Sequence, residues 1–126
     1  MNLIIELFIA LICHGGVCHV DRLYISREAM AIASCESGDG YNFGTYQFDA
    51  RNDVTGDGGM WQFNDATYVW LTGHDHAERD HVATQHDVFV RLWDNGNGWR
   101  HWRSSQRCWS QWLDIEGDRA VWKDEQ

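Results

Sequence analysis

Clusters of glycine divide this chain of 126 residues into short segments and limit the folds open to it. Turn-forming runs at residues 37–40, 51–59 and 95–98 each end a stretch with a regular apolar pattern. Between them come one helical pattern, one segment in which aromatic and polar residues alternate, and then two or three further helical patterns. This order predicts an α+β fold, and the length suits a single domain.

The first helix is expected from its cap and its break. Ser26 is a suitable N-cap for a helix that runs to about Cys35 and Glu36, where a Ser-Gly-Asp-Gly run ends it. The alternation of aromatic and polar residues from 41 to 63 then predicts a short β-hairpin or sheet with a polar loop.

The later helices are expected from similar signals. Asn64, or the aspartate after it, can cap a helix that Gly73 ends. A longer helix is expected from about residue 75 to 94, with apolar residues along one face. We expect Trp70 and Trp93 in the core because they fall at helical spacing.

The two ends of the chain are expected to lie outside the main domain. Residues 1–12 are apolar except for Glu6 and one Asn, and the apolar side chains at helical spacing are Leu3, Leu7, Ala10 and Leu11. The stretch is shorter than the roughly 20 residues of a membrane span, and it has no positively charged start, so a docked N-terminal helix is favoured over a cleaved signal or an anchor. The expected divisions are residues 1–25 (apolar helix and Cys/His loop), 26–112 (main domain) and 113–126 (polar tail).

Charge and aromatic content narrow the partners. The chain has 10 Lys and Arg against 19 Asp and Glu, a net charge of −9 with neutral His. It has no basic cluster for a phosphate backbone, so nucleic acid is not expected as a partner. Eight Trp residues suit a cleft for flat partners such as sugars.

The four cysteines favour an oxidising compartment. They allow two disulfides in three connectivities. Cys13 and Cys18, with a His after each, could complete a zinc tetrahedron or a stretched haem motif, but neither spacing matches, and a local disulfide or free thiols are favoured. A second cluster has no pair at helical i, i+4 spacing, so no metal site is expected from His74, His76, His81 and His86.

Glu36 is the residue that could carry chemistry. It stands at the expected end of a helix, just before the glycine-containing break. Against Trp and Met side chains its carboxyl would be desolvated, which raises the pKa and suits a general acid. A solvent-exposed Glu at a helix end is the common alternative.

The motifs around Glu36 carry a resemblance to a known family. Cys-Glu-Ser-Gly at 35–38 is followed by Gly-Gly-Met-Trp-Gln-Phe at 58–63 and Asn-Asp-Ala-Thr at 64–67. This arrangement resembles the lysozyme-like peptidoglycan hydrolases, most of all the resuscitation-promoting factor domain. Lytic transglycosylases share the helix-end Glu and a related Gly-apolar-apolar-Gln motif. The resemblance covers residues 27–109 and implies a mainly helical, lysozyme-like α+β fold with a small β-hairpin segment beside the catalytic cleft.

The resemblance also implies a role for each matching residue. Glu36 matches the acid that protonates the glycosidic oxygen between N-acetylmuramic acid and N-acetylglucosamine. Cys108 matches a cysteine that bonds to the one before the catalytic Glu, which implies a Cys35–Cys108 disulfide. The implied or neighbouring saccharide contacts are Gln62, Thr67, Gly59, Trp61, Tyr46 and Trp99. For Trp61 the alternative is a core wall beneath the cleft.

Asp57 departs from the resuscitation-factor pattern. An Asp five residues before the Gln is where c-type lysozymes keep their second carboxylate, so Asp57 is a candidate nucleophile or electrostatic stabiliser facing Glu36. Asp-Gly is also a common turn dipeptide, and the two roles can coincide. Asp49 and Asp53 are fallback candidates. Without a second carboxylate, the N-acetyl or 6-hydroxyl group of the substrate would trap the intermediate and give a transglycosylase product.

The expected function is therefore cleavage of the glycan strand of peptidoglycan, by a muramidase or a lytic transglycosylase. No metal or organic cofactor is implied, and the expected location is extracellular or on the envelope side. Delivery as a secreted bacterial protein or by a phage, with virion or envelope partners, stays open. The alternative is a non-catalytic wall-binding or virion structural module, which the acidic charge favours because the cell wall is itself anionic.

Overall fold

The computed structural model describes residues 4–123, and the side chains in this range except those of residues 7–14 and 17–22. Within this range the chain forms four α-helices, three 3-10 segments and three small antiparallel sheets, which confirms the α+β class. In chain order the elements are β1 (Ile4–His14), β2 (Val17–Ser26), α1 (Arg27–Glu36), β3 (Arg51–Asn52), β4 (Asp57–Gly58), β5 (Phe63–Asn64), α2 (Asp65–Thr72), η1 (Ala77–Arg79), α3 (Val82–Trp93), η2 (Asp94–Gly96), η3 (Trp99–Ser105), α4 (Gln106–Trp109), β6 (Leu113–Glu116) and β7 (Arg119–Trp122).

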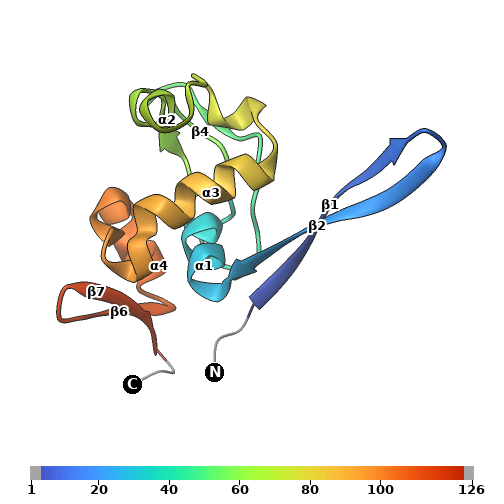
Figure 1. Ribbon diagram of the computed structural model, residues 1–126. Coiled ribbons are helices and arrows are strands. Elements are labelled where there is room, and N and C mark those ends of the chain that lie inside the picture. The colour runs from blue at the N-terminus through green and yellow to red at the C-terminus, as the bar shows by residue number, and fades with distance from the viewer. Residues whose placement is uncertain (1–3, 124–126) are drawn as a thin grey trace.

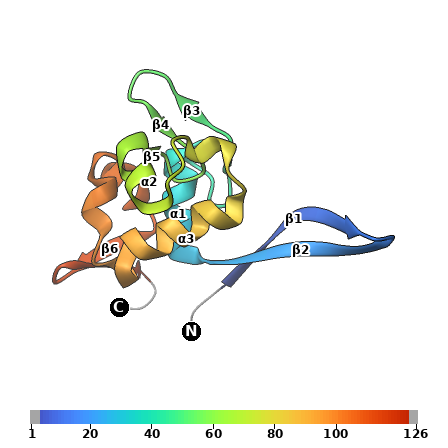
Figure 2. The ribbon, with the colours of Figure 1, turned by 45° about the horizontal axis from the view of Figure 1, so that its top comes forward.

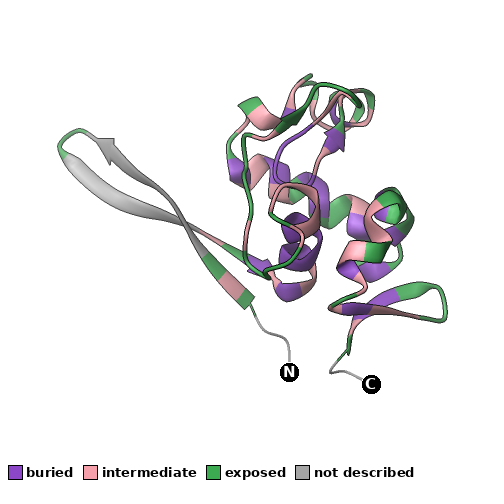
Figure 3. Ribbon diagram, turned by 180° about the vertical axis from the view of Figure 1, so that it is seen from behind, coloured by how far each residue is buried: buried purple, intermediate pink, exposed green. Residues whose placement is uncertain are grey.

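Helix α1 lies at the centre of the molecule and carries the core. The Ser26 side chain accepts a hydrogen bond from the backbone N–H of Ala29, as an N-cap does, and the helix ends at Glu36, as expected. The six consecutive residues 29–34 of this helix are all buried, so other elements enclose the helix on every side. Figure 3 shows this buried helix surrounded by more exposed elements.

The helix predicted for residues 1–12 is wrong from residue 4 onward: β1 and β2 form a long antiparallel hairpin. Gly15 and Gly16 both have positive φ (56° and 81°), which a two-residue hairpin turn of type I′ requires, so the Gly-Gly pair reverses the chain. The hairpin extends away from the helices (Figures 1 and 2). Of the part of the chain described, no helix is both long and apolar enough to cross a bilayer.

The β segment is shorter than predicted. Strands β3, β4 and β5 form one antiparallel sheet, with two residues in each strand. The aromatic run at residues 41–48 forms turns and irregular backbone instead of strands. Asp39 is one reason, because its carboxylate accepts hydrogen bonds from the backbone N–H groups of Tyr41 and Asn42 and so closes a turn.

Helices α2 and α3 cover one side of α1 and the sheet. Asn64 caps α2 through its side chain and Gly73 ends it in the left-handed conformation, as expected. The helix predicted from residue 75 is α-helical only from Val82, and the 3-10 segment η1 precedes it. Between the two, Asp80 accepts hydrogen bonds from Tyr68 and His74. Trp93 is in the core.

Trp70 is not in the core, in contrast to the prediction. Its side chain is 81% exposed, while Tyr68 on the same helix is fully buried. Helix α2 therefore turns the face that carries Tyr68 toward the core and the side with Trp70 toward solvent. Helical spacing alone does not indicate which of two large aromatic residues is buried.

The predicted polar tail forms a second hairpin, so the expectation for residues 113–126 is wrong as far as residue 123. Strands β6 and β7 pair in register from Leu113 with Trp122 to Glu116 with Arg119. Gly117 has a φ of 66° at the first position of the turn, where a type II′ turn takes Gly. The core side chains of the hairpin are Leu113, Ala120 and Val121.

Candidate active site

Glu36 stands at the C-terminal end of α1, where the chain is tied to the β segment. The next residue, Ser37, donates a hydrogen bond from its hydroxyl to the backbone carbonyl of Met60 at 2.8 Å. The same hydroxyl accepts a bond from the backbone N–H of Gln47 at 3.0 Å. The end of α1, and with it the backbone of Glu36, is thereby held against two loops.

The carboxyl of Glu36 has a strongly raised pKa. Burial raises the pKa of Glu36 from 4.5 to about 7, a hydrogen bond from Ser105 lowers it, and the negative charge of Asp57 raises it. The group is therefore close to half protonated near neutral pH. A carboxylic acid that keeps its proton near neutrality, beside a second carboxylate, has the properties of a general acid.

Asp57 is the second carboxylate that the fold brings to Glu36. It lies in β4, the middle strand of the small sheet, paired with Asn52 on one side and Asn64 on the other. Its negative charge raises the pKa of Glu36, as the smallest of three causes after burial and the hydrogen bond from Ser105. The fallback residues Asp49 and Asp53 lie exposed in the segments on either side of β3.

Ser105 is a site residue that the sequence reasoning missed. Its hydroxyl donates a hydrogen bond to Oε1 of Glu36 at 2.6 Å, across 69 positions of sequence. A serine carries no recognisable pattern in such a segment. The one indication was its place three residues before Cys108, because the resemblance links that cysteine to the residue before Glu36.

The disulfide between Cys35 and Cys108 is present, as the resemblance implied. The two Cα atoms are 5.9 Å apart and the residues are separated by 73 positions. The bond joins α4 to the last turn of α1, directly beside Glu36. Cys13 and Cys18 face each other in the register of β1 and β2, but the predictions on their side chains fall outside the described part of the chain.

Gly59 and Gln62 both have structural contacts in the loop around β4. Gly59 has a φ of 89°, and a Cβ there would lie 2.4 Å from Oε1 of Gln85, so the missing side chain makes room for a buried glutamine. The Gln62 side chain donates hydrogen bonds to the backbone carbonyls of Ala50 and Gly59. Its backbone φ of 53° is unusual for a residue with a side chain. Gln62 therefore braces the loop around β4.

Two of the predicted Trp contacts are core residues. Trp61 is fully buried, stacks on Phe89 with ring centroids 5.0 Å apart, and donates from its indole to the carbonyl of Ala29. Trp61 is therefore a core residue, the alternative given for it above, and has no exposed surface with which to contact a saccharide. Trp99 is 7% exposed and its indole donates to the carbonyl of Asp118 in the C-terminal hairpin. Neither ring has a free face to offer a sugar.

Two other predicted contacts keep accessible surface. Tyr46 is 36% exposed in the loop after α1. Thr67 is partly buried in the first turn of α2, where its backbone N–H donates to the side chain of Asn64. Neither residue has a described contact with Glu36.

One group of side chains has ligands suitable for a metal ion. The candidate ligand atoms of Asp65, His76 and Glu78 all lie within 4.8 Å of one another. Arg51 donates to Asp65 at 2.9 Å and to Glu78 at 3.1 Å. A guanidinium therefore already neutralises these carboxylates and links β3 to α2 and η1.

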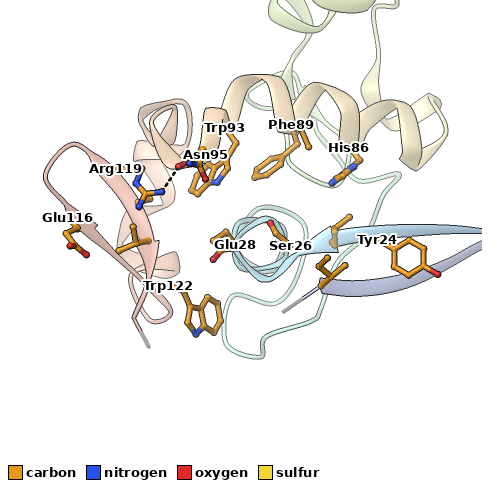
Figure 4. Close-up of a pocket in the computed structure, with 15 residues that line it drawn as sticks. Tyr24, Ser26, Glu28, His86, Phe89, Trp93, Asn95, Glu116, Arg119 and Trp122 are labelled. Carbon is orange, nitrogen blue, oxygen red and sulfur yellow. Dashed lines mark hydrogen bonds between the residues drawn. The ribbon is translucent and has the colours of Figure 1, made fainter. Parts of the chain in front are cut away.

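A pocket of about 750 Å³ lies at the other end of α1. Figure 4 shows Glu28 of α1 between α3, the base of the N-terminal hairpin at Tyr24 and the C-terminal hairpin at Trp122. The guanidinium of Arg27 lies 4.9 Å from the centroid of the Trp122 ring. Glu36 is not among the lining residues, so this pocket and the candidate acid are separate features.

Comparisons with models of protein families, with curated proteins and with solved structures find no match to this chain. The chemistry of the site therefore rests on its own geometry and on the resemblance of its motifs.

Proposed function

We propose that this protein cleaves the glycan strand of peptidoglycan between N-acetylmuramic acid and N-acetylglucosamine, with Glu36 as the general acid. The observation that carries the proposal is the partly buried carboxyl of Glu36, whose pKa is about 7 and on which the charge of Asp57 acts. Glycosidases commonly use two carboxyl groups in different environments, one of which keeps its proton near neutral pH, as Glu36 partly does. The motifs at 35–38 and 58–67 support the choice of substrate.

In the proposed reaction Glu36 gives its proton to the glycosidic oxygen as the bond from that oxygen to the anomeric carbon breaks. The leaving sugar departs as an alcohol and the anomeric carbon becomes cationic. Asp57 stabilises this charge or bonds to the carbon. In hydrolysis a water then adds to the anomeric carbon, the bond to Asp57 breaks where one has formed and releases the carboxylate, and the proton of the water returns to Glu36.

The lytic transglycosylase route differs only in the second half. The 6-hydroxyl of the muramic acid attacks the anomeric carbon in place of water and gives its proton to Glu36. The product is an anhydro sugar that is lighter than the hydrolysis product by one water. This route needs no nucleophilic carboxylate, so it makes the charge of Asp57 less important.

Loss of turbidity of purified cell walls tests the proposal. The comparison is wild type, Glu36→Gln and Glu116→Gln, the last a matched control on the exposed strand β6. We expect clearing by wild type and the control, and a rate at least about a hundredfold lower for Glu36→Gln, as for loss of a general acid. Clearing by Glu36→Gln at the wild-type rate would remove Glu36 from the mechanism.

The masses of the released fragments separate the two routes. Fragments that carry an added water identify a muramidase, and we then expect Asp57→Asn to lose most activity. Anhydro fragments identify a transglycosylase, and Asp57→Asn should then keep much of its rate. The matched control for Asp57 is Asp75→Asn, on the exposed segment between α2 and η1.

The second candidate function is a wall-binding or structural module without catalysis. The net charge of −9 favours it, because an acidic protein gains no electrostatic attraction toward an anionic wall. Two of the expected saccharide contacts, Trp61 and Trp99, are also buried. Co-sedimentation with walls that does not depend on salt, with no clearing on several wall types, would select this function.

The disulfide supports an extracellular or envelope-side location, because such bonds persist in oxidising compartments. Delivery by secretion or as part of a phage particle fits this location equally.

A further inference from the structure

Ser105 contacts the proposed catalytic acid from a distant part of the chain. It ends η3 and lies directly before α4, and its hydroxyl is 2.6 Å from Oε1 of Glu36. An O–H···O distance this short is typical of a bond in which one partner is ionised. The contact is partly buried, so competition from water is reduced.

The direction of this hydrogen bond follows from the number of protons. The Ser105 hydroxyl has one proton and two acceptors in reach, Oε1 of Glu36 at 2.6 Å and the carbonyl of Trp102 at 3.2 Å. The Trp102 carbonyl already accepts a bond from the indole of Trp109 at 2.9 Å. The Ser105 hydroxyl therefore donates its hydrogen bond to Glu36 in preference to the Trp102 carbonyl.

We infer that Ser105 is a positioning residue for Glu36: it occupies Oε1 and leaves Oε2 as the oxygen that carries the transferable proton. The inference rests on the proposed function, since it assigns a task within that reaction. A carboxyl without such a partner can rotate and present its proton on either oxygen. With Ser105 in place, the proton is kept on one oxygen in one orientation, which is the geometric requirement for proton transfer to a bound sugar.

The Cys35–Cys108 disulfide holds the segment that contains Ser105 next to the end of α1. Cys108 lies one turn beyond Ser105, and its bond to Cys35 attaches this segment to the residue next to Glu36. The disulfide therefore keeps the segment of Ser105 close to Glu36. The neighbouring Ser104 lies in the same segment, but it is exposed.

Three causes act on the pKa of Glu36, and burial, the largest, raises it. The hydrogen bond from Ser105 of η3 lowers the pKa by stabilising the carboxylate, and the charge of Asp57 of β4 raises it. Removal of the hydroxyl therefore raises the pKa further, by roughly one unit for a hydrogen bond to a charged group. It also frees the carboxyl to rotate, which lowers the catalytic rate.

The test compares Ser105→Ala, the hydroxyl-retaining Ser105→Thr and the control Ser104→Ala. The first readout is the titration of the Glu36 carboxyl by carbon-13 NMR, with Glu36→Gln to assign the signal. We expect an upward shift of about one pKa unit in Ser105→Ala and wild-type titration in Ser104→Ala. Ser105→Thr should restore most of the wild-type value. An unchanged titration in Ser105→Ala would overturn the inference, whether or not the protein is an enzyme.

The second readout is the rate of wall cleavage against pH. In Ser105→Ala we expect kcat to fall by roughly tenfold with little change in KM, and the alkaline limb of the profile to move to higher pH. A profile that falls in height but keeps its limb would show a structural role only and would also overturn the inference. Absence of cleavage by wild type contradicts the proposed function instead, and leaves the NMR titration as the test of Ser105.

Discussion

Oε1 of Gln85 accepts a hydrogen bond from the backbone N–H of Met60 at 2.7 Å, and both residues are fully buried. The amide nitrogen of Gln85 donates to the carbonyls of Phe48 and Asp80. One side chain of α3 thus satisfies three backbone groups of the loops that carry the site. The close approach of this side chain leaves no room for a Cβ at residue 59, and the positive φ of Gly59 is a second reason for glycine there.

Gln85→Met should destabilise the protein strongly. The substitution keeps the approximate volume but leaves the buried Met60 N–H and two partly buried carbonyls without their partner, so we expect a loss of about 3 kcal/mol in the free energy of unfolding. Urea denaturation measures it, with Gln47→Met on the exposed loop as the control. A loss as small as that of the control would mean that water replaces Gln85 at no cost.

Trp61 and Trp70 should differ in their effect on stability. Trp61 is fully buried and Trp70 is 81% exposed. Trp61→Ala should cost about 3–5 kcal/mol, and Trp70→Ala should change the unfolding free energy by no more than about 0.5 kcal/mol. Equal losses in thermal unfolding would contradict the placement of α2.

Loss of the Cys35–Cys108 bond should destabilise the fold because it raises the conformational entropy of the unfolded chain. The bond spans 73 positions, and a closed loop of that length contributes roughly 4 kcal/mol or less. The comparison is wild type with the double variant Cys35→Ser, Cys108→Ser under urea. The same variant should raise the pKa of Glu36, because Ser105 is then held less firmly. Unchanged stability would argue against a bond that constrains the chain.

Glu36 should cost stability at neutral and alkaline pH. Its pKa is 4.5 in an unfolded reference and about 7 in the fold, so the folded protein binds the proton more tightly. Stability from this group is full below pH 4.5 and is lost as the pH rises through 7, by about 3 kcal/mol in total. Glu36→Gln should therefore be more stable than wild type above pH 7, and the two should converge near pH 4. A difference that does not vary with pH would contradict the raised pKa.

Local signals in the sequence predicted the centre of the fold well. The cap at Ser26, the end of the helix at Glu36, and the cap at Asn64 with its stop at Gly73 all depend on contacts within a few residues. The Cys35–Cys108 bond came from the resemblance and is confirmed.

The misses have two physical causes. The first is turn chemistry, because Gly15, Gly16 and Gly117 form the tight turns that make hairpins of the apolar start and the polar end of the chain. The second is contact between residues far apart in sequence. The buried roles of Trp61 and Gly59 depend on α3, more than twenty positions away in sequence. Ser105 reaches Glu36 only through the folded chain, so no local pattern could assign it.

The most direct test of the central claim is the pH dependence of the rate at which walls release soluble glycan fragments. For wild type we predict an alkaline limb near pH 7, where Glu36 loses its proton, and for Glu36→Gln no cleavage across the range. Cleavage by wild type that persists unchanged well above pH 7, or wild-type cleavage by Glu36→Gln, would contradict the role of Glu36 as the general acid.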